Sequence, residues 1–140
     1  MANISVIGLD SLMEDIEAAA ELPDSVAEDM LDAEAGIVEE AQVYTGMKMG
    51  VYRTGVTLSS ITHGEMKTEK DGGRIKYVGP QGVNENGDRN AEVAFINEFG
   101  APNRGIVARP FIRTANEVAA GEAVAAAMEV YDDYLKKQNL

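Results

Sequence analysis

The chain has 140 residues, a net charge of −12 and no cysteine. This length favours one domain over residues 1–140 that buries a core without covalent staples, and the lack of cysteine excludes disulfides, a thiolate nucleophile and a cysteine-ligated metal. No apolar run approaches the roughly 20 residues that span a bilayer, and the N-terminus lacks a basic segment followed by an apolar one, so we expect neither a membrane span nor a secretion signal.

The charge is unevenly distributed along the chain. Residues 1–47 hold 12 Asp or Glu and no Lys or Arg, whereas residues 48–140 hold the other 12 acids and all 12 bases. The acidic block argues against phosphate binding by this part of the chain, because phosphate neutralisation needs Lys and Arg. Two interpretations stay open: a solvated helical face, or a surface that repels polyanions or meets a basic partner.

Two helices are predicted in this acidic third. Residues 9–20 carry apolar side chains at helical spacing and begin with a capping box, Ser11-x-x-Glu14. Pro23 then breaks the chain, and Ser25-x-x-Glu28 is a second capping box that opens a longer helix. The first apolar stripe is Leu9, Leu12, Met13, Ile16 and Ala20, and the second is Val26, Met30, Ala33, Ile37, Ala41 and Tyr44. We treat residues 1–22 as a helical extension of the domain.

The middle of the chain predicts one helical turn and a hairpin. The turn of helix lies around Leu58, after a Thr-Gly break. Two extended segments then flank Asp71-Gly72-Gly73, which tolerate the positive φ of a tight turn. In the second strand Ile75 and Tyr77 share one face, while Arg74 and Lys76 share the other. A sheet this small needs helices or a neighbouring subunit to cover its open edges.

The last third predicts a short helix, a strand and a long helix. Residues 91–99 should be helical and end at Gly100, and residues 106–112 should be extended because Pro110 disfavours helix at the residue before it. A third capping box at Thr114 opens an alanine-rich helix. Its predicted buried stripe is Ala120, Val124, Ala127, Tyr131 and Leu135. The fold class is therefore α+β, with N-terminal helices, a small antiparallel sheet built on a hairpin and a long C-terminal helix.

Catalytic and metal-binding patterns are weak in this sequence. His63, the single histidine, has no evident partner and is expected at the solvated surface. Ser59-Ser60 lacks the glycine-flanked nucleophile elbow. The stretch at residues 84–88 faintly resembles a calcium loop, but Arg89 replaces the turn glycine and Phe95 the final glutamate. We predict no enzyme activity, no catalytic residues, no cofactor and no metal site.

Residues 95–115 concentrate the aromatic and arginine side chains, including all three phenylalanines of the chain. Their apolar members suggest a main core at the junction of the sheet and the last helix. Glu98 is placed to pair with Arg109 or Arg113, within one chain or across a subunit boundary. The candidate interface residues are Glu98, Phe99, Arg104, Arg109, Phe111 and Arg113. The simpler interpretation is that this segment only closes the core.

Three short sequence motifs (the first, second and third words) follow one another along the chain and resemble those of the tail-completion, or head–tail joining, family of long-tailed bacteriophages. The first word matches at Thr54, Gly55, Leu58, Ser60 and Ile61; the second at Glu98, Phe99 and Gly100; the third at Pro110, Phe111, Arg113 and Ala115. The chain departs from the family at Ser59, where the family has arginine, at Val93-Ala94 (or a shifted Phe95), where it has tyrosine-alanine, and at Thr114, where it has a second proline. The loop between the second and third words is also short. The resemblance covers roughly residues 25–135.

The resemblance implies a structural protein of the virion, assembled in the host cytoplasm. Such proteins form a ring in the phage neck or at the head-proximal end of the tail, usually a hexamer. The ring joins head to tail and surrounds the path of the exiting DNA, so the expected partners are other copies of the chain and neighbouring connector and tail-tube proteins. The DNA would pass without specific binding, and an acid-lined channel would repel its phosphates.

Two alternatives come from other functional classes. An acidic DNA-mimic inhibitor would use the clustered charge as its functional surface, act as a monomer or dimer and bind a basic protein. A small carboxylate-dependent enzyme would need a metal and measurable turnover.

Overall fold

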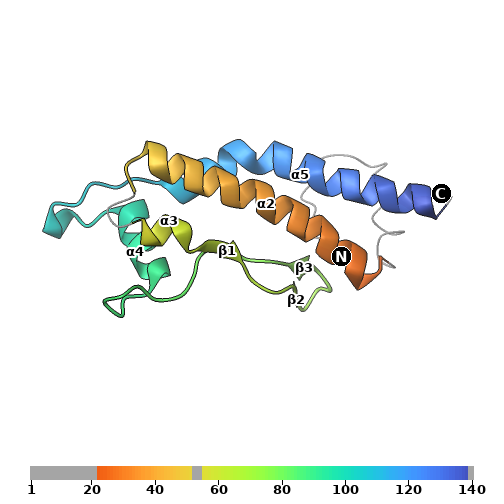
Figure 1. Ribbon diagram of the computed structural model, residues 1–140, viewed down its shortest axis with the longest axis horizontal. Coiled ribbons are helices and arrows are strands. Elements are labelled where there is room, and N and C mark those ends of the chain that lie inside the picture. The colour runs from red at the N-terminus through yellow and green to blue at the C-terminus, as the bar shows by residue number, and fades with distance from the viewer. Residues whose placement is uncertain (1–21, 52–54, 139–140) are drawn as a thin grey trace.

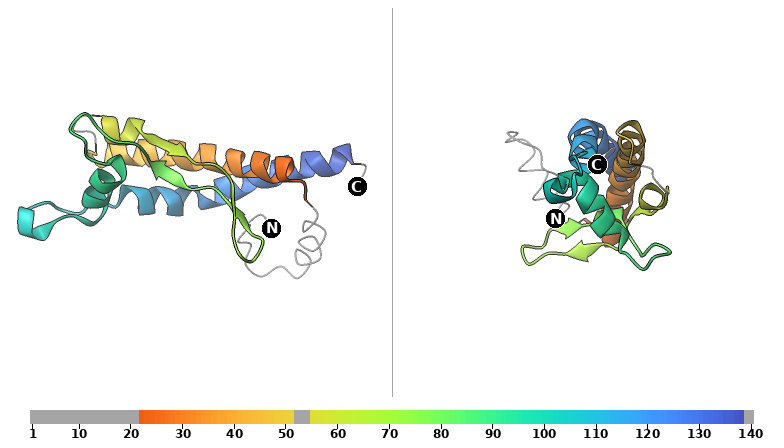
Figure 2. Two further views of the ribbon diagram at one scale, coloured as in Figure 1. Left: turned by 90° about the horizontal axis from the view of Figure 1, so that it is seen from below. Right: turned by 90° about the vertical axis from the view of Figure 1, so that its left-hand side faces the viewer.

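The computed structural model describes residues 22–51 and 55–138, and two long helices dominate it (Figure 1). Helix α2 spans Asp24–Lys48 and helix α5 spans Phe111–Lys137. They lie side by side and antiparallel along the long axis of the molecule (Figures 1 and 2). The helix predicted over residues 9–20 lies outside the described residues, as does Thr54 of the first family word.

Shorter elements connect the two long helices. They are α3 (Val56–Ser59), β1 (Ile61–His63), β2 (Lys67–Thr68), β3 (Arg74–Ile75), β4 (Val78–Pro80), α4 (Asn90–Phe99) and the 3-10 helix η1 (Pro102–Arg104). Helices α3 and α4 lie at one end of the pair, and the hairpin runs along α2 toward its start (Figure 1). The predicted α+β class is confirmed, with its small antiparallel sheet and its long C-terminal helix. The turn of helix around Leu58 and the helix ended by Gly100 are also present.

Prolines set the starts of both long helices. Pro23 precedes α2 and Pro110 precedes α5, and neither helix has a side-chain cap from its own N-terminal residue. The capping boxes predicted at Ser25 and Thr114 are therefore wrong, because each helix has already begun by that position. The predicted strand over 106–112 is also wrong: residues 107–110 have no regular structure and Phe111 is the first residue of α5. A proline is compatible with a helix start because its fixed φ suits the helix and its missing N–H is not needed there.

Small side chains line much of the contact between the two long helices. The buried residues of α5 recur every four positions, at Phe111, Ala115, Ala119, Ala123 and Ala127. The predicted stripe is one position out of phase at Ala120 and Val124, and Ala120 is exposed, but it is correct at Ala127, which is buried, and at Tyr131, which packs against the apolar cluster that contains Ala127. The buried residues of α2 are Ala27, Met30, Leu31, Ala35, Gln42 and Gly46. Met30 was predicted correctly, whereas Tyr44 is 63% exposed.

Two apolar clusters hold the opposite ends of the helix pair. One contains Val51, Leu58, Ile61, Ala94 and Phe111, where α3, β1 and α4 meet the start of α5. The other contains Leu22, Ala27, Met30 and Ala127, and Tyr131 and Tyr134 pack against it. Between the clusters, Gln42 Nε2 donates a hydrogen bond of 3.1 Å to Asn116 Oδ1.

The hairpin forms as predicted but is interrupted by a bulge. Strand β1 pairs antiparallel with β4, with Ile61 opposite Pro80, and β2 pairs with β3, with Lys67 opposite Ile75. Three residues, 64–66, lie between β1 and β2, whereas only residues 76 and 77 lie between β3 and β4. The extra residue forms the bulge and bends the hairpin. Gly72 has φ +87° in the turn, and the Gly73 N–H donates to the Asp71 carboxylate.

The basic face of the hairpin packs against the acids of α2. Arg74 Nε lies 3.3 Å from an Asp24 carboxylate oxygen, and Lys76 Nζ lies 3.1 Å from Glu28 and 2.6 Å from Asp32. The side chain of Lys76 is only 5% exposed. Burial opposes its positive charge, but the hydrogen bonds to Asp32 and Glu28 outweigh this, so the pKa of Lys76 is raised above its ordinary value.

His63 belongs to the same interface and is not a solvated surface residue as predicted. Its Nδ1 contacts a carboxylate oxygen of Glu39, and its Nε2 lies 3.3 Å from a carboxylate oxygen of Asp32. Four acids of α2 therefore face cationic or imidazole groups of the hairpin: Asp24, Glu28, Asp32 and Glu39. Much of the acidic block within α2 has a partner in its own chain.

Candidate functional site

The second and third family words meet at the start of α5. Glu98, near the end of α4, is 9% exposed and accepts backbone hydrogen bonds from Ile112 (2.9 Å) and Arg113 (3.1 Å). Its carboxylate satisfies N–H groups in the first turn of α5, where the helix dipole also favours negative charge. The ion pair predicted between Glu98 and Arg109 or Arg113 is thus replaced by a helix cap supplied from a different helix.

The loop between these two words is held by close backbone packing. Gly100 has φ +74°, and a Cβ at this position would lie 2.8 Å from both Ile106 O and Ala108 N. The Arg109 N–H donates to Asn97 O at 2.6 Å. A side chain at Gly100 is therefore excluded by both conformation and space. The first word joins the same region, because Leu58 and Ile61 share the apolar cluster with Phe111.

The six predicted interface residues divide into two groups. Phe99, Arg104, Arg109 and Arg113 are exposed, whereas Glu98 and Phe111 are buried inside the chain. Within the chain, Glu98 caps α5, and Phe111, with no exposed surface, fills the core. The phenylalanines likewise do not form a single core.

Phe95 and Phe99 form an exposed aromatic pair on α4. They are 62% and 63% exposed, and their ring centroids lie 4.6 Å apart with the rings tilted by 46°. One turn separates them along the helix, so both side chains lie on the same face. This face borders a groove of about 550 Å³ between β4, α4 and the first turns of α5.

The groove is mainly apolar with a polar wall. Its apolar lining includes Val78, Pro80, Phe95, Phe99 and Ile112. Arg113, Asn116 and Glu117 of α5 lie on the polar side. Sequence reasoning identified Phe99 and Arg113 but missed the groove itself, because the two sides come from segments far apart in the chain. The alternation of the hairpin did indicate an apolar face, and Tyr77 on that face is 62% exposed.

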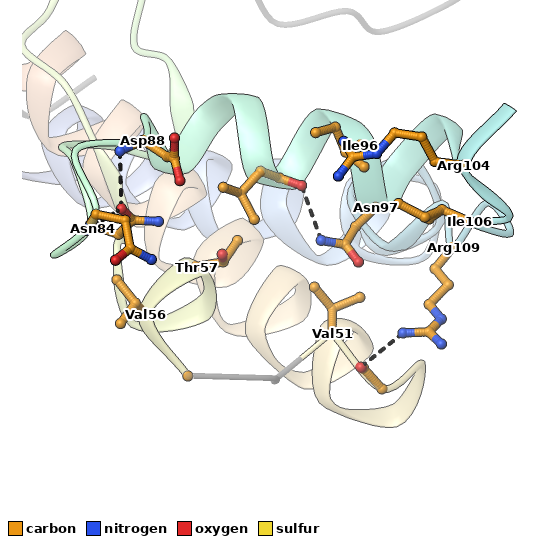
Figure 3. A pocket seen from close by; sticks show the side chains of 14 residues that line it. Val51, Val56, Thr57, Asn84, Asp88, Ile96, Asn97, Arg104, Ile106 and Arg109 are labelled. Atoms are coloured by element: carbon orange, nitrogen blue, oxygen red, sulfur yellow. Dashed lines mark hydrogen bonds between the residues drawn. The ribbon is translucent and has the colours of Figure 1, made fainter. Parts of the chain in front are cut away.

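A second hollow, of about 500 Å³, lies on the other side of α4 (Figure 3). Arg104 and Arg109 line one end of it, and Arg109 Nη1 donates to Gly50 O at 3.1 Å. Asn84 and Asp88 line the other end, where the Asp88 N–H donates to Asn84 Oδ1 at 3.0 Å. Among the described residues, no group of three or more His, Cys, Asp or Glu side chains is arranged to hold a metal ion.

Comparisons with known proteins give no match: no family model, no curated protein and no solved structure resembles the chain closely enough to count. In the part of the chain that the structure describes, no helix is both long and apolar enough to cross a membrane.

Proposed function

We propose that this protein is a non-enzymatic structural subunit that self-associates into a ring, as a head–tail joining protein of a long-tailed phage would. The observation that carries the proposal is the open apolar groove with the Phe95–Phe99 pair at its rim. Contiguous exposed apolar surface of this kind marks interaction sites on soluble proteins. The residues that resemble the joining family also converge there, since Glu98 caps the helix that begins with the third word.

The ring would be a hexamer in the neck or at the head-proximal end of the tail. Connector and tail-tube proteins would be its neighbours, and DNA would pass through it without specific binding. The DNA-mimic alternative is less favoured, because the hairpin neutralises several acids of α2 that a basic partner would have to contact.

The proposal is tested by native mass spectrometry over a range of protein concentrations, with negative-stain images of the same samples. A closed ring is the expected result. Phe99→Ala should weaken the assembly, whereas Tyr44→Ala should not, although both side chains are 63% exposed. Monomers at every concentration, alone and with isolated phage neck components, would contradict the proposal.

Arg113 offers a second test of the same surface. Its side chain is exposed and lies on the wall of the groove, while its backbone N–H is what Glu98 holds. Arg113→Ala should therefore weaken assembly and leave the unfolding free energy of the monomer within about 0.5 kcal/mol of that of the native chain. A destabilised monomer that still assembles normally would contradict an interface role for this side chain.

A further inference from the structure

We infer that the groove between β4, α4 and α5 receives residues 9–20 of a second copy of the chain. The inference rests on the self-association proposed above and names the segment that carries it. An amphipathic helix that lies in an apolar groove is a common mode of recognition and uses anchors spaced at i, i+3, i+4 and i+7. Leu9, Leu12, Met13 and Ile16 have this spacing.

The charge of the segment also suits the groove. Its polar face carries Asp10, Glu14, Asp15 and Glu17 and no base. Arg113 is exposed on the polar wall of the groove, where Asn116 and Glu117 also lie. An acidic helix seated with its apolar stripe on Phe95 and Phe99 brings carboxylates to this side. Opposite charges at the rim of an interface favour encounter and orientation.

The segment cannot lie in the groove of its own chain as a helix. Leu22 is buried at the end of α2 that packs on Ala127. The groove begins near Asn116, which contacts Gln42, and 18 residues of helix from Asp24 to Gln42 correspond to about 27 Å. A helix over residues 9–20 is about 18 Å long, and two linking residues add about 7 Å. Leu9 would at most reach the near edge of the groove.

A second copy does not have this limit. The donor end at Leu22 and the acceptor groove lie at opposite ends of the helix pair, so each chain has one of each (Figure 1). Contact between two different surfaces is heterologous, and repeating it produces a closed ring when the rotation per subunit permits. The same geometry is therefore compatible with a closed ring, and its smallest closed form is a pair of chains that exchange segments.

Cross-linking between differently substituted chains tests the inference directly. The chain has no cysteine, so introduced thiols are the only ones present. Full-length Met13→Cys protein is mixed with full-length Glu117→Cys protein and treated with a short bis-maleimide; Glu117 is an exposed residue of the groove wall and is not one of its apolar anchors. Ser11→Cys is the matched control, because helical spacing would place Ser11 opposite the apolar stripe. Ile16→Cys mixed with Ala91→Cys, which also lies exposed on the groove, provides an independent second pair.

Mixed dimers of Met13→Cys with Glu117→Cys should form at least about tenfold faster than those of Ser11→Cys with Glu117→Cys, since a seated segment raises the effective thiol concentration. Equal rates in a sample that native mass spectrometry shows to be oligomeric would overturn the inference and leave the proposed function standing. Monomers without mixed dimers would overturn both. In a Met13→Cys/Glu117→Cys double variant, intramolecular cross-linking at a rate independent of protein concentration would overturn the exchange between copies.

Discussion

The cap of α5 by Glu98 makes a sharp prediction about stability. Glu98→Ala removes the acceptor of the Ile112 and Arg113 N–H groups, which lie at 2.9 and 3.1 Å from its oxygens in a site that is 9% exposed. Each buried N–H left without a partner costs about 1–3 kcal/mol, so the expected loss in unfolding free energy for the two groups is about 2–6 kcal/mol. Glu98→Gln keeps one good acceptor oxygen and should lose about half as much.

Urea unfolding followed by circular dichroism measures this loss. With a slope of about 2 kcal/mol per M for a chain of this size, the Glu98→Ala midpoint should fall by roughly 1–3 M. Glu92→Ala, on the same helix, is the control: Glu92 is 61% exposed and only pairs with Arg89, so it should change stability by less than about 0.5 kcal/mol. Equal midpoints for the two variants would refute the idea that Glu98 holds the start of α5.

The same assay checks three further expectations. Gly46→Ala should lower the unfolding free energy by about 1–3 kcal/mol, because its Cβ would lie 2.5 Å from Leu58 and 3.1 Å from the Phe111 ring. A Cβ at Gly36 would meet open space, so Gly36→Ala should raise the unfolding free energy by about 0.5–1 kcal/mol. A change of stability in the same direction for both variants would contradict the packing. Phe111→Ala should cost about 3–5 kcal/mol, and a near-neutral result would show that the ring is not core. Lys76→Met should lower stability at neutral pH by about 1–3 kcal/mol. The folded-state pKa of Lys76 lies above its ordinary value of 10.5, so the stabilisation by its charge is complete below pH 10.5 and is lost as the pH rises through the folded-state pKa. The unfolding free energies of the native chain and the variant should therefore converge above that pKa. A difference that stays constant to higher pH would contradict this.

Local signals in the sequence were enough to predict the main elements. The helical spacing around Met30, the Asp-Gly-Gly turn and the stop at Gly100 each depend on residues close together in the chain, and all three features are present. The phase of α5 is different. Alanine occupies so many positions of this helix that several stripes look alike, and only packing against α2 selects Ala119 over Ala120.

Contacts between distant segments account for the remaining differences. Nothing near Glu98 in the sequence indicates that its carboxylate caps a helix that begins 13 residues later. The alternation of Arg74 and Lys76 was visible, but their ion pairs with α2 depend on how the hairpin docks. The three phenylalanines looked equivalent because they share one segment; a helical turn of α4 exposes two of them while Phe111 is buried. The groove likewise depends on how these distant segments pack together.

The alanine stripe of α5 has a consequence for the alignment of the two long helices. Buried residues that recur every four positions would still meet small side chains if α5 slid along α2 by one turn, because Ala119 would then occupy the place of Ala115. The alanine stripe alone therefore does not fix the position of α5 along α2. What distinguishes the observed alignment is the hydrogen bond from Gln42 to Asn116 and the fit of Phe111 against Gly46. A single polar pair and one aromatic ring thus fix how far α5 lies along α2, and they hold the groove at a fixed distance from Leu22.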